Sequence, residues 1–181
     1  MEIRIINKAH EADINIPNNP FPLRGRMIVT RDETGWHHRE ELLPPEKVTE
    51  MVFPDENYNF DEMPDSIFLG AYEDDKCVGL SILTPDFNPC LFLYDLKVDR
   101  SVRGKGVGRM LIEASLKIAL EKNYKGLYTT GQDNNLNACR FYLACGFEIG
   151  GLDTAIYEGT KQSGKYDIFF YKRLPCEGKS K

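Results

Sequence analysis

The sequence of 181 residues lacks the features that mark secreted, membrane-crossing and metal-knuckle proteins. It has no run of about 18 apolar residues, and its first ten residues lack the apolar core of a signal peptide. Its five cysteines are odd in number and form no Cys-x-x-Cys pair, which argues against a disulfide framework and a zinc knuckle. We therefore expect reduced cysteines, a cytoplasmic location and no membrane partner.

Positive charge is also scarce. The 23 Lys and Arg residues are outnumbered by 28 Asp and Glu residues, which gives a net charge of −5. Binding to nucleic acid needs a clustered basic face, so we expect no nucleic-acid partner and a surface that attracts cations instead. A hydrophobic content of 41% suits one compact domain over residues 1–181, with a homodimer left open.

Clear secondary-structure signals begin at residue 66. Residues 1–65 carry few signals, although Pro44-Pro45 predicts one or two helical turns over residues 47–53. Alternating apolar residues and short turns then predict a series of strands at 66–72, 77–84, 90–98, 126–130, 148–157 and 166–174. Helical spacing of apolar residues predicts helices over 107–123 and 136–145, and residues 175–181 are expected to be a flexible tail.

Three glycines interrupt the chain between the third strand and the first helix, in the stretch VRGKGVGR at 102–109. A Walker loop does not fit, because its only Gly-Lys-Ser ending has Arg173 at the first-glycine position. A dinucleotide fingerprint does not fit either, because Gly106 and Gly108 are only two residues apart. The remaining interpretation is a pyrophosphate at the positive end of the helix, with an ordinary glycine-rich turn as the alternative.

The second helix carries a spaced set of its own. Asn135, Ala138 and Tyr142 share one helical face, and Gly146-Phe147 follows. Asp133 or Asn134 is expected to cap the start of this helix, and Gly146 is expected to end it. Tyr142 is read either as a functional phenol or as an aromatic packed between Phe141 and Phe147.

These two blocks together resemble the GNAT superfamily of acetyl-CoA-dependent N-acetyltransferases over about residues 66–174. The pyrophosphate loop of that family reads Arg/Gln-x-x-Gly-x-Gly/Ala, and its next helix carries Asn, Ala, Tyr and then Gly-Phe. A narrower resemblance is to the streptothricin acetyltransferases, through the stretch QDNNLNACRFYLACGFEIGGLDTAIY and through PFPLRGRMIV, Trp36 and DDKCVG. Those enzymes acetylate an amine of the β-lysine side chain of streptothricin antibiotics.

The resemblance implies an α/β fold. We expect a mixed, largely antiparallel sheet of six to seven strands flanked by helices, splayed between 90–98 and 126–130, with acetyl-CoA in the splay and no metal. The implied acetyl-CoA contacts are main-chain groups of the third strand, amides of the glycine loop, and the face of the second helix. In chain order they are Leu96, Lys97, Val98, Arg103, Gly104, Lys105, Gly106, Val107, Gly108, Arg109, Asn135, Ala138 and Tyr142.

Amine acetylation makes two demands on catalytic side chains. A free amine with a pKa near 10.4 is neutral for only about one part in a thousand at pH 7.4, so a base or a relaying water is needed. Strict alternation puts Phe92, Tyr94 and Leu96 on one face of the strand and Asp95 on the other. Asp95, Tyr94 and a water relayed to either remain candidates, and a structural carboxylate is the alternative for Asp95. Tyr142 is the candidate that protonates the departing thiolate.

A polycationic acceptor would bind to carboxylates and aromatic rings. The candidate acceptor residues are Trp36, Tyr94, Asp95, Asp153 and Tyr157, with Glu33 a further carboxylate. The alternatives are a core position for Trp36 and a bulge cap for Asp153. The pair His37-His38 does not predict a metal site, because neighbouring side chains on a strand diverge. Two other functions stay open, namely acetylation of an aminoglycoside, polyamine or protein lysine, and a CoA-binding regulator without turnover.

Overall fold

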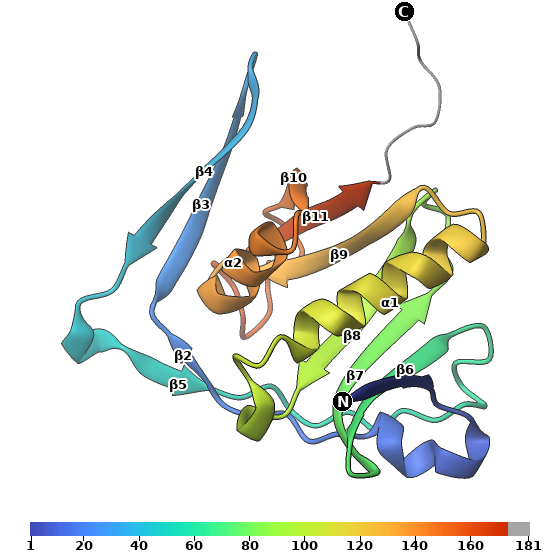
Figure 1. Cartoon of the computed structure of the whole chain (residues 1–181). Helices are drawn as coiled ribbons and strands as arrows, with labels where there is room; N and C mark the ends of the chain where they lie inside the picture. The colour runs from blue at the N-terminus through green and yellow to red at the C-terminus, as the bar shows by residue number, and fades with distance from the viewer. Residues whose placement is uncertain (174–181) are drawn as a thin grey trace, which may run out of the picture.

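A computed structural model describes residues 1–173, so residues 174–181, the end of the last predicted strand and the predicted tail, lie outside the described residues. Its centre is a seven-stranded sheet of order β1-β6-β7-β8-β9-β11-β10 (Figure 1). These strands are β1 (Glu2–Ile5), β6 (Ile67–Glu73), β7 (Lys76–Thr84), β8 (Leu91–Val98), β9 (Gly126–Gln132), β10 (Glu148–Asp153) and β11 (Asp167–Arg173). The expected mixed, largely antiparallel sheet is confirmed, because only the β8–β9 pair is parallel.

The predicted meander is present as strands β6, β7 and β8. Its first turn joins the paired residues Glu73 and Lys76 through Asp74 and Asp75, whose φ angles are +49° and +61°. Two consecutive left-handed residues match the right-handed twist of a hairpin, and aspartate tolerates that conformation better than most side chains. Local turn chemistry therefore explains why this part of the sheet was predictable.

Two α-helices cover one face of the sheet, α1 (Val107–Glu121) and α2 (Leu136–Ala144) (Figure 1). Both were predicted to within two residues at each end. The predicted cap of α2 is wrong, because Asn135 is the N-cap and its side-chain oxygen accepts from the backbone N–H of Ala138. Gly146, with φ of +81°, follows the end of α2 as expected.

The first 66 residues fold into elements that the sequence did not reveal. They include the 3₁₀ segments η1 (Lys8–Ile14) and η2 (Pro45–Lys47), the pair β2 (Phe21–Leu23) and β5 (Thr49–Met51), and the hairpin of β3 (Gly25–Asp32) with β4 (Gly35–Leu42). The helical turns expected over 47–53 are wrong. The start signal at Pro44-Pro45 produces only the single 3₁₀ turn η2, which ends at Lys47. Pairing with β2 then satisfies the backbone of Thr49–Met51, so the helix does not continue.

A second correction concerns the strand predicted over 148–157, which ends at Asp153. The Asp153 side chain accepts hydrogen bonds from the N–H groups of Ala155 and Ile156, at 2.9 and 3.0 Å. An aspartate that bonds the backbone two and three residues onward favours a turn over a continued strand.

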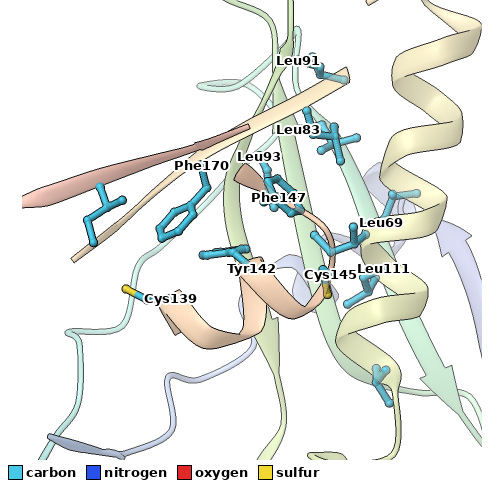
Figure 2. Close-up of a cluster of buried hydrophobic side chains, with 14 of the residues drawn as sticks. Leu69, Leu83, Leu91, Leu93, Leu111, Cys139, Tyr142, Cys145, Phe147 and Phe170 are labelled. Atoms are coloured by element: carbon cyan, nitrogen blue, oxygen red, sulfur yellow. The ribbon is translucent and has the colours of Figure 1, made fainter. Parts of the chain in front are cut away.

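The main core lies between the sheet and the two α-helices, where Leu93, Leu111, Tyr142 and Phe170 meet (Figure 2). A smaller core covers the opposite face, where η1 and part of segment 52–66 pack on Leu80 and Ile82. Within residues 1–173, no helix is long and apolar enough to cross a membrane.

Strands β8 and β9 diverge soon after they start. They share only two register pairs, Leu91 with Leu127 and Phe92 with Tyr128, and one bond from the Thr129 hydroxyl to the Leu93 carbonyl at 2.8 Å. The expected splay is therefore confirmed. After Leu93, the edge of β8 that faces β9 has no strand partner.

A β-bulge changes the faces of β8. Ile82 pairs with Asp95 and Leu83 with Leu93, so Tyr94 is the extra residue. The predicted alternation is wrong for this reason, because the bulge moves Leu96 onto the α-helical face while Asp95 joins the face that carries Ile82.

Candidate functional site

A cleft of about 850 Å³ opens where β8 and β9 diverge. It runs from the glycine loop, past α2, to the opposite face of the sheet. Most of the residues predicted for the site line it, namely Tyr94, Asp95, Leu96, Lys97, Val98, Arg103, Gly104, Gly106, Val107, Gly108, Arg109, Asn135, Ala138, Tyr142 and Tyr157. The tertiary structure thus gathers residues from the strand, the loop and the second helix around one cavity.

The glycine loop forms the start of α1. Gly104 and Gly106 have φ angles of +78° and +83°, a backbone conformation that side chains disfavour, and no atom lies within 4 Å of a Cβ built on either. Gly106 is the N-cap of α1, so the first N–H groups of the helix have no partner within it and are free for an anion. This open cradle fits a pyrophosphate.

Gly108 has a different physical role from the other two glycines. A Cβ on Gly108 would lie 2.9 Å from the Phe141 ring, so this glycine lets α1 pack closely against α2. The two helices that flank the cleft are held together at this point.

Two arginine side chains attach the glycine loop to neighbouring backbone. Arg103 donates from Nε to the Val98 carbonyl at 3.0 Å, and Arg109 donates to the Ala144 carbonyl at 2.8 Å. Both line the cleft, whereas Lys105 does not. The two guanidinium groups therefore add positive charge where the cradle lies.

Tyr142 packs among aromatic rings and also lines the cleft. Its ring packs against Phe147 and Phe170, with centroids 5.5 and 5.4 Å apart, and its side chain is only 9% exposed (Figure 2). It nevertheless lines the cleft. Burial raises the pKa of Tyr142 above its usual value, against a smaller lowering by hydrogen bonding with Thr129, so the phenol holds its proton at neutral pH.

At the far end of the cleft, β8 presents Asp95 and Lys97 beside Glu56 from segment 52–66. The Lys97 ammonium lies 2.5 Å from Glu56 and 3.5 Å from Asp95, and the Tyr58 hydroxyl donates to Asp95 at 3.1 Å. Burial raises the pKa of Asp95, while the charge of Lys97 acts in the opposite direction. Asp95 is thus a partly shielded carboxylate rather than a simple backbone cap.

A second carboxylate lies on the β11 side of the cleft. Asp167 is 7% exposed and accepts a hydrogen bond from the Tyr157 hydroxyl at 2.8 Å, and Gln132 donates to the same hydroxyl at 2.9 Å. Burial raises the pKa of Asp167, and the charges of Asp153 and Asp133 raise it further. A cation in this part of the cleft would relieve that repulsion.

Four predicted residues lie elsewhere. Trp36 packs against the main core and lines a separate shallow depression with His38 and Arg173. Asp153 caps the turn after β10 rather than a bulge, and Lys105 lies outside the cleft lining. Glu33, at the exposed tip of the β3–β4 hairpin, also lies outside it.

Sequence reasoning missed Glu56, Asp167, Phe21 and Phe53, which line the cleft. A lone acid at the start of the apolar strand Asp167–Arg173 was a usable signal for Asp167. Glu56 lies in a segment without helix or strand, so no periodicity marked it.

Comparison with known proteins agrees with this geometry. The family described as Acetyltransferase (GNAT) family matches residues 34–147. Streptothricin acetyltransferase A of Bacillus subtilis (strain 168) is 30% identical over 162 residues, which cover 90% of this chain and 94% of that protein.

Two solved structures share the whole fold. One is a Bacillus anthracis str. Ames protein assigned as a streptothricin acetyltransferase, in complex with acetyl coenzyme A. It is 26% identical with a TM-score of 0.83, over 96% of this chain and 97% of that one. The other is a nourseothricin acetyltransferase, 29% identical with a TM-score of 0.79, over 96% of this chain and 98% of that one.

Proposed function

The chain belongs to the GNAT acetyltransferase family and is an acetyl-CoA-dependent N-acetyltransferase, and we propose that its acceptor is the β-lysine amine of streptothricin antibiotics. The observation that carries this proposal is the cleft itself. It joins a glycine loop suited to a pyrophosphate to a far end lined by Glu56, Asp95 and Asp167. Carboxylates there suit an acceptor with several ammonium groups.

Acetyl-CoA is placed by its diphosphate. Amides of Gly106, Val107 and Gly108 at the start of α1 receive the pyrophosphate, and the unpaired edge of β8 at Leu96–Val98 receives the pantetheine arm. The side-chain oxygen of Asn135 caps α2, which leaves its amide group for the same arm. This arrangement directs the thioester to the point where β8 and β9 part.

The reaction then needs a proton acceptor and a proton donor. Asp95, or a water between it and Tyr94, takes one proton from the acceptor ammonium, and the neutral amine attacks the thioester carbonyl. As the carbon–sulfur bond breaks, the Tyr142 phenol protonates the sulfur and recovers a proton from the new amide nitrogen. The net products are the acetylated amine, CoA thiol and one proton.

Acceptor contacts follow from the walls of the cleft. Tyr157 and Asp167 would bind a second cationic group, because both line the cleft and the Asp167 carboxylate accepts a hydrogen bond from a neutral hydroxyl, that of Tyr157. Phe21 and Phe53, whose rings lie 5.3 Å apart, add an apolar wall from the first 66 residues. We further propose that residues 1–181 are a single acetyltransferase domain, with 1–65 forming the acceptor side and 66–174 the core.

A cytoplasmic location is part of the same proposal. The four cysteines of the described residues, Cys77, Cys90, Cys139 and Cys145, are all free thiols, as a reducing compartment requires. The substrate is a small cationic molecule, so the proposal needs neither a nucleic-acid nor a membrane partner.

Acetyl transfer is tested by incubating the protein with acetyl-CoA and streptothricin and measuring product mass. The expected result is a single added acetyl group on the β-lysine moiety, with CoA thiol released in equal amount. Parallel incubations with an aminoglycoside, a polyamine and a lysine peptide separate this acceptor from the others. If one of those amines is acetylated rapidly and streptothricin is not, the acceptor assignment is wrong. CoA that is released in the absence of any acceptor reports hydrolysis of acetyl-CoA and does not count as acetyl transfer.

A further inference from the structure

Four side chains at the far end of the cleft form one connected group, here called the Lys97 cluster (Glu56, Tyr58, Asp95 and Lys97). Lys97 is the cation at its centre, 8% exposed, and its ammonium contacts both carboxylates at the distances given above. Its charge also lies 5.3 Å from the centroid of the Tyr58 ring. A buried lysine with two carboxylates is a costly arrangement, and it persists only where the groups satisfy one another.

The cluster joins two parts of the chain that have no strand pairing with each other. Asp95 and Lys97 come from β8 beyond its bulge, whereas Glu56 and Tyr58 come from segment 52–66. That segment is held by side chains, because Asn15 exchanges two hydrogen bonds with the Tyr58 backbone and Asn18 donates to Glu56 at 2.9 Å. Lys97 therefore holds segment 52–66, which forms this wall of the cleft, against β8, the strand that carries Asp95.

The cluster has one negative charge in excess, from two carboxylates and one ammonium. Glu56, Asp95 and Lys97 all line the cleft. A cationic acceptor would neutralise this excess, so the cluster attracts the form of the amine that must then lose a proton.

Resting on the proposed function, we propose that Lys97 is a positioning residue that holds Asp95 ionised as the proton acceptor, and that Glu56 acts on Asp95 in the opposite sense. In the step that this supports, the acceptor ammonium gives one proton to the Asp95 carboxylate and becomes a neutral amine. Its lone pair then forms the nitrogen–carbon bond to the thioester carbonyl, and the electrons of the carbon–sulfur bond leave with the sulfur.

The charges around Asp95 determine the direction in which each variant should change its pKa. Burial raises the pKa of Asp95, Lys97 lowers it, the charge of Glu56 raises it, and the hydrogen bond from Tyr58 lowers it. Together with Tyr94, the bulged residue beside Asp95, these are the titratable groups near it on β8 and segment 52–66. From α2, the Tyr142 phenol is close enough for the charge of Asp95 to raise its pKa. Removing Lys97 or Glu56 should therefore move the ionisation of Asp95 in opposite directions.

The pH profile of kcat/KM for the acceptor tests this directly. Its acidic limb reports the ionisation of Asp95. Lys97→Met should move that limb to higher pH by about 1 to 3 units, which is the usual effect of losing a close opposite charge. Glu56→Gln should move it to lower pH, and Lys97→Arg, which keeps the charge, should leave it close to that of the unaltered protein.

A matched control uses a second lysine–carboxylate pair, which joins η1 to segment 52–66. Lys8 pairs with Asp61 at 2.6 Å, but both side chains are exposed and neither lines the cleft. Lys8→Met should leave the limb unmoved. Limbs that stay in place for both Lys97→Met and Glu56→Gln, or that move in the same direction, overturn the proposal.

A second measurement needs no turnover. NMR titration of the Asp95 carboxyl carbon in the protein without ligands should show the same opposite shifts in the two variants. If the unaltered protein does not acetylate streptothricin, the proposed function fails, yet this titration still decides the role of Lys97. Conversely, normal acetylation with an Asp95 titration that neither variant moves rejects the Lys97 proposal alone.

Discussion

At the scale of single residues, burial changes the pKa of side chains whose residue type alone would suggest an ordinary value. Tyr142 and Asp167 are both buried and both line the cleft. Burial penalises their charged forms, so the pKa of each is raised. For the phenol this preserves a proton to donate, and for the carboxylate it leaves a site that favours a cation.

Tyr142→Phe should lower kcat about 100-fold, in line with the loss of one general acid, while the Kd for acetyl-CoA changes less than about threefold. The ring packing with Phe147 and Phe170 is kept, so stability should barely change. Stopped-flow kinetics and calorimetric binding measure the two quantities. Tyr128→Phe is the control, because Tyr128 packs outside the cleft lining, and equal losses in both variants would contradict the proton-donor role.

Asp167→Asn should raise the melting temperature at pH 7. The pKa of Asp167 is raised in the folded state, so this group favours folding below its unfolded pKa and that contribution is lost as pH rises through its folded pKa. Above both values the buried charge destabilises the fold, and the neutral amide removes that effect. Calorimetry should show the gain at pH 7 and its disappearance near pH 3, with no such gain for the exposed Asp65→Asn.

The same variant should raise the KM for the acceptor about tenfold, because a charged hydrogen-bond acceptor is lost from the cleft. A more stable protein with an unchanged acceptor KM would exclude Asp167 from acceptor binding.

Among the elements, the β3–β4 hairpin forms a sheet of its own, so tertiary contacts attach it to the rest of the protein. It lies beside α2 (Figure 1), Met27 bonds to the backbone of Asp133, and Arg26 pairs with the Asp133 carboxylate. Asp133 is 1% exposed, so its charge relies on that partner. On the outer side, Arg140 of α2 pairs with Glu40, where both side chains are partly in solvent.

Arg26→Met should destabilise the protein by about 3 kcal/mol, because it leaves the buried Asp133 charge without a counter-ion. Arg140→Met breaks a surface pair between the same hairpin and α2 and should cost less than about 1 kcal/mol. Urea unfolding at pH 7 measures both free energies. Similar losses would show that the hairpin is held by its apolar residues rather than by the buried pair.

For the whole molecule, the cleft is built from distant parts of the chain: the first 66 residues, the two diverging strands and both α-helices. A ligand that fills it contacts all of them at once. Binding to the folded state alone must then raise the stability of the entire chain.

Acetyl-CoA at about 100 times its Kd should stabilise the protein by roughly 2.7 kcal/mol, which corresponds to about 5 to 10 °C in melting temperature for a chain of this size. Gly106→Val should remove most of this shift, because its side chain would enter the cradle and disfavour the φ of +83°. Gly35→Val, at a hairpin position with φ of +130°, carries similar strain away from the cleft and should keep the shift. Scanning calorimetry with and without acetyl-CoA distinguishes the two.

Much of the core region was predictable because its signals are local. The Asp74–Asp75 turn, the helical spacing of Val107, Leu111 and Ala114, and Gly146 after α2 each depend on residues close in sequence. The site was only partly predictable for the same reason. Gly106 and Tyr142 belong to compact motifs, whereas Glu56 reaches Lys97 from 41 residues away.

Local sequence signals were enough to predict the strand and helix order after residue 66, the glycine turn at the start of α1, and the phenol on α2. The bulge at Tyr94, the lining of the acceptor end and the course of the first 66 residues depend on contacts between distant parts of the chain. These depend on pairings such as Arg26 with Asp133, 107 residues apart, which form only when the chain is compact. Local periodicity records which face of an element is apolar, but not which distant side chain will meet it.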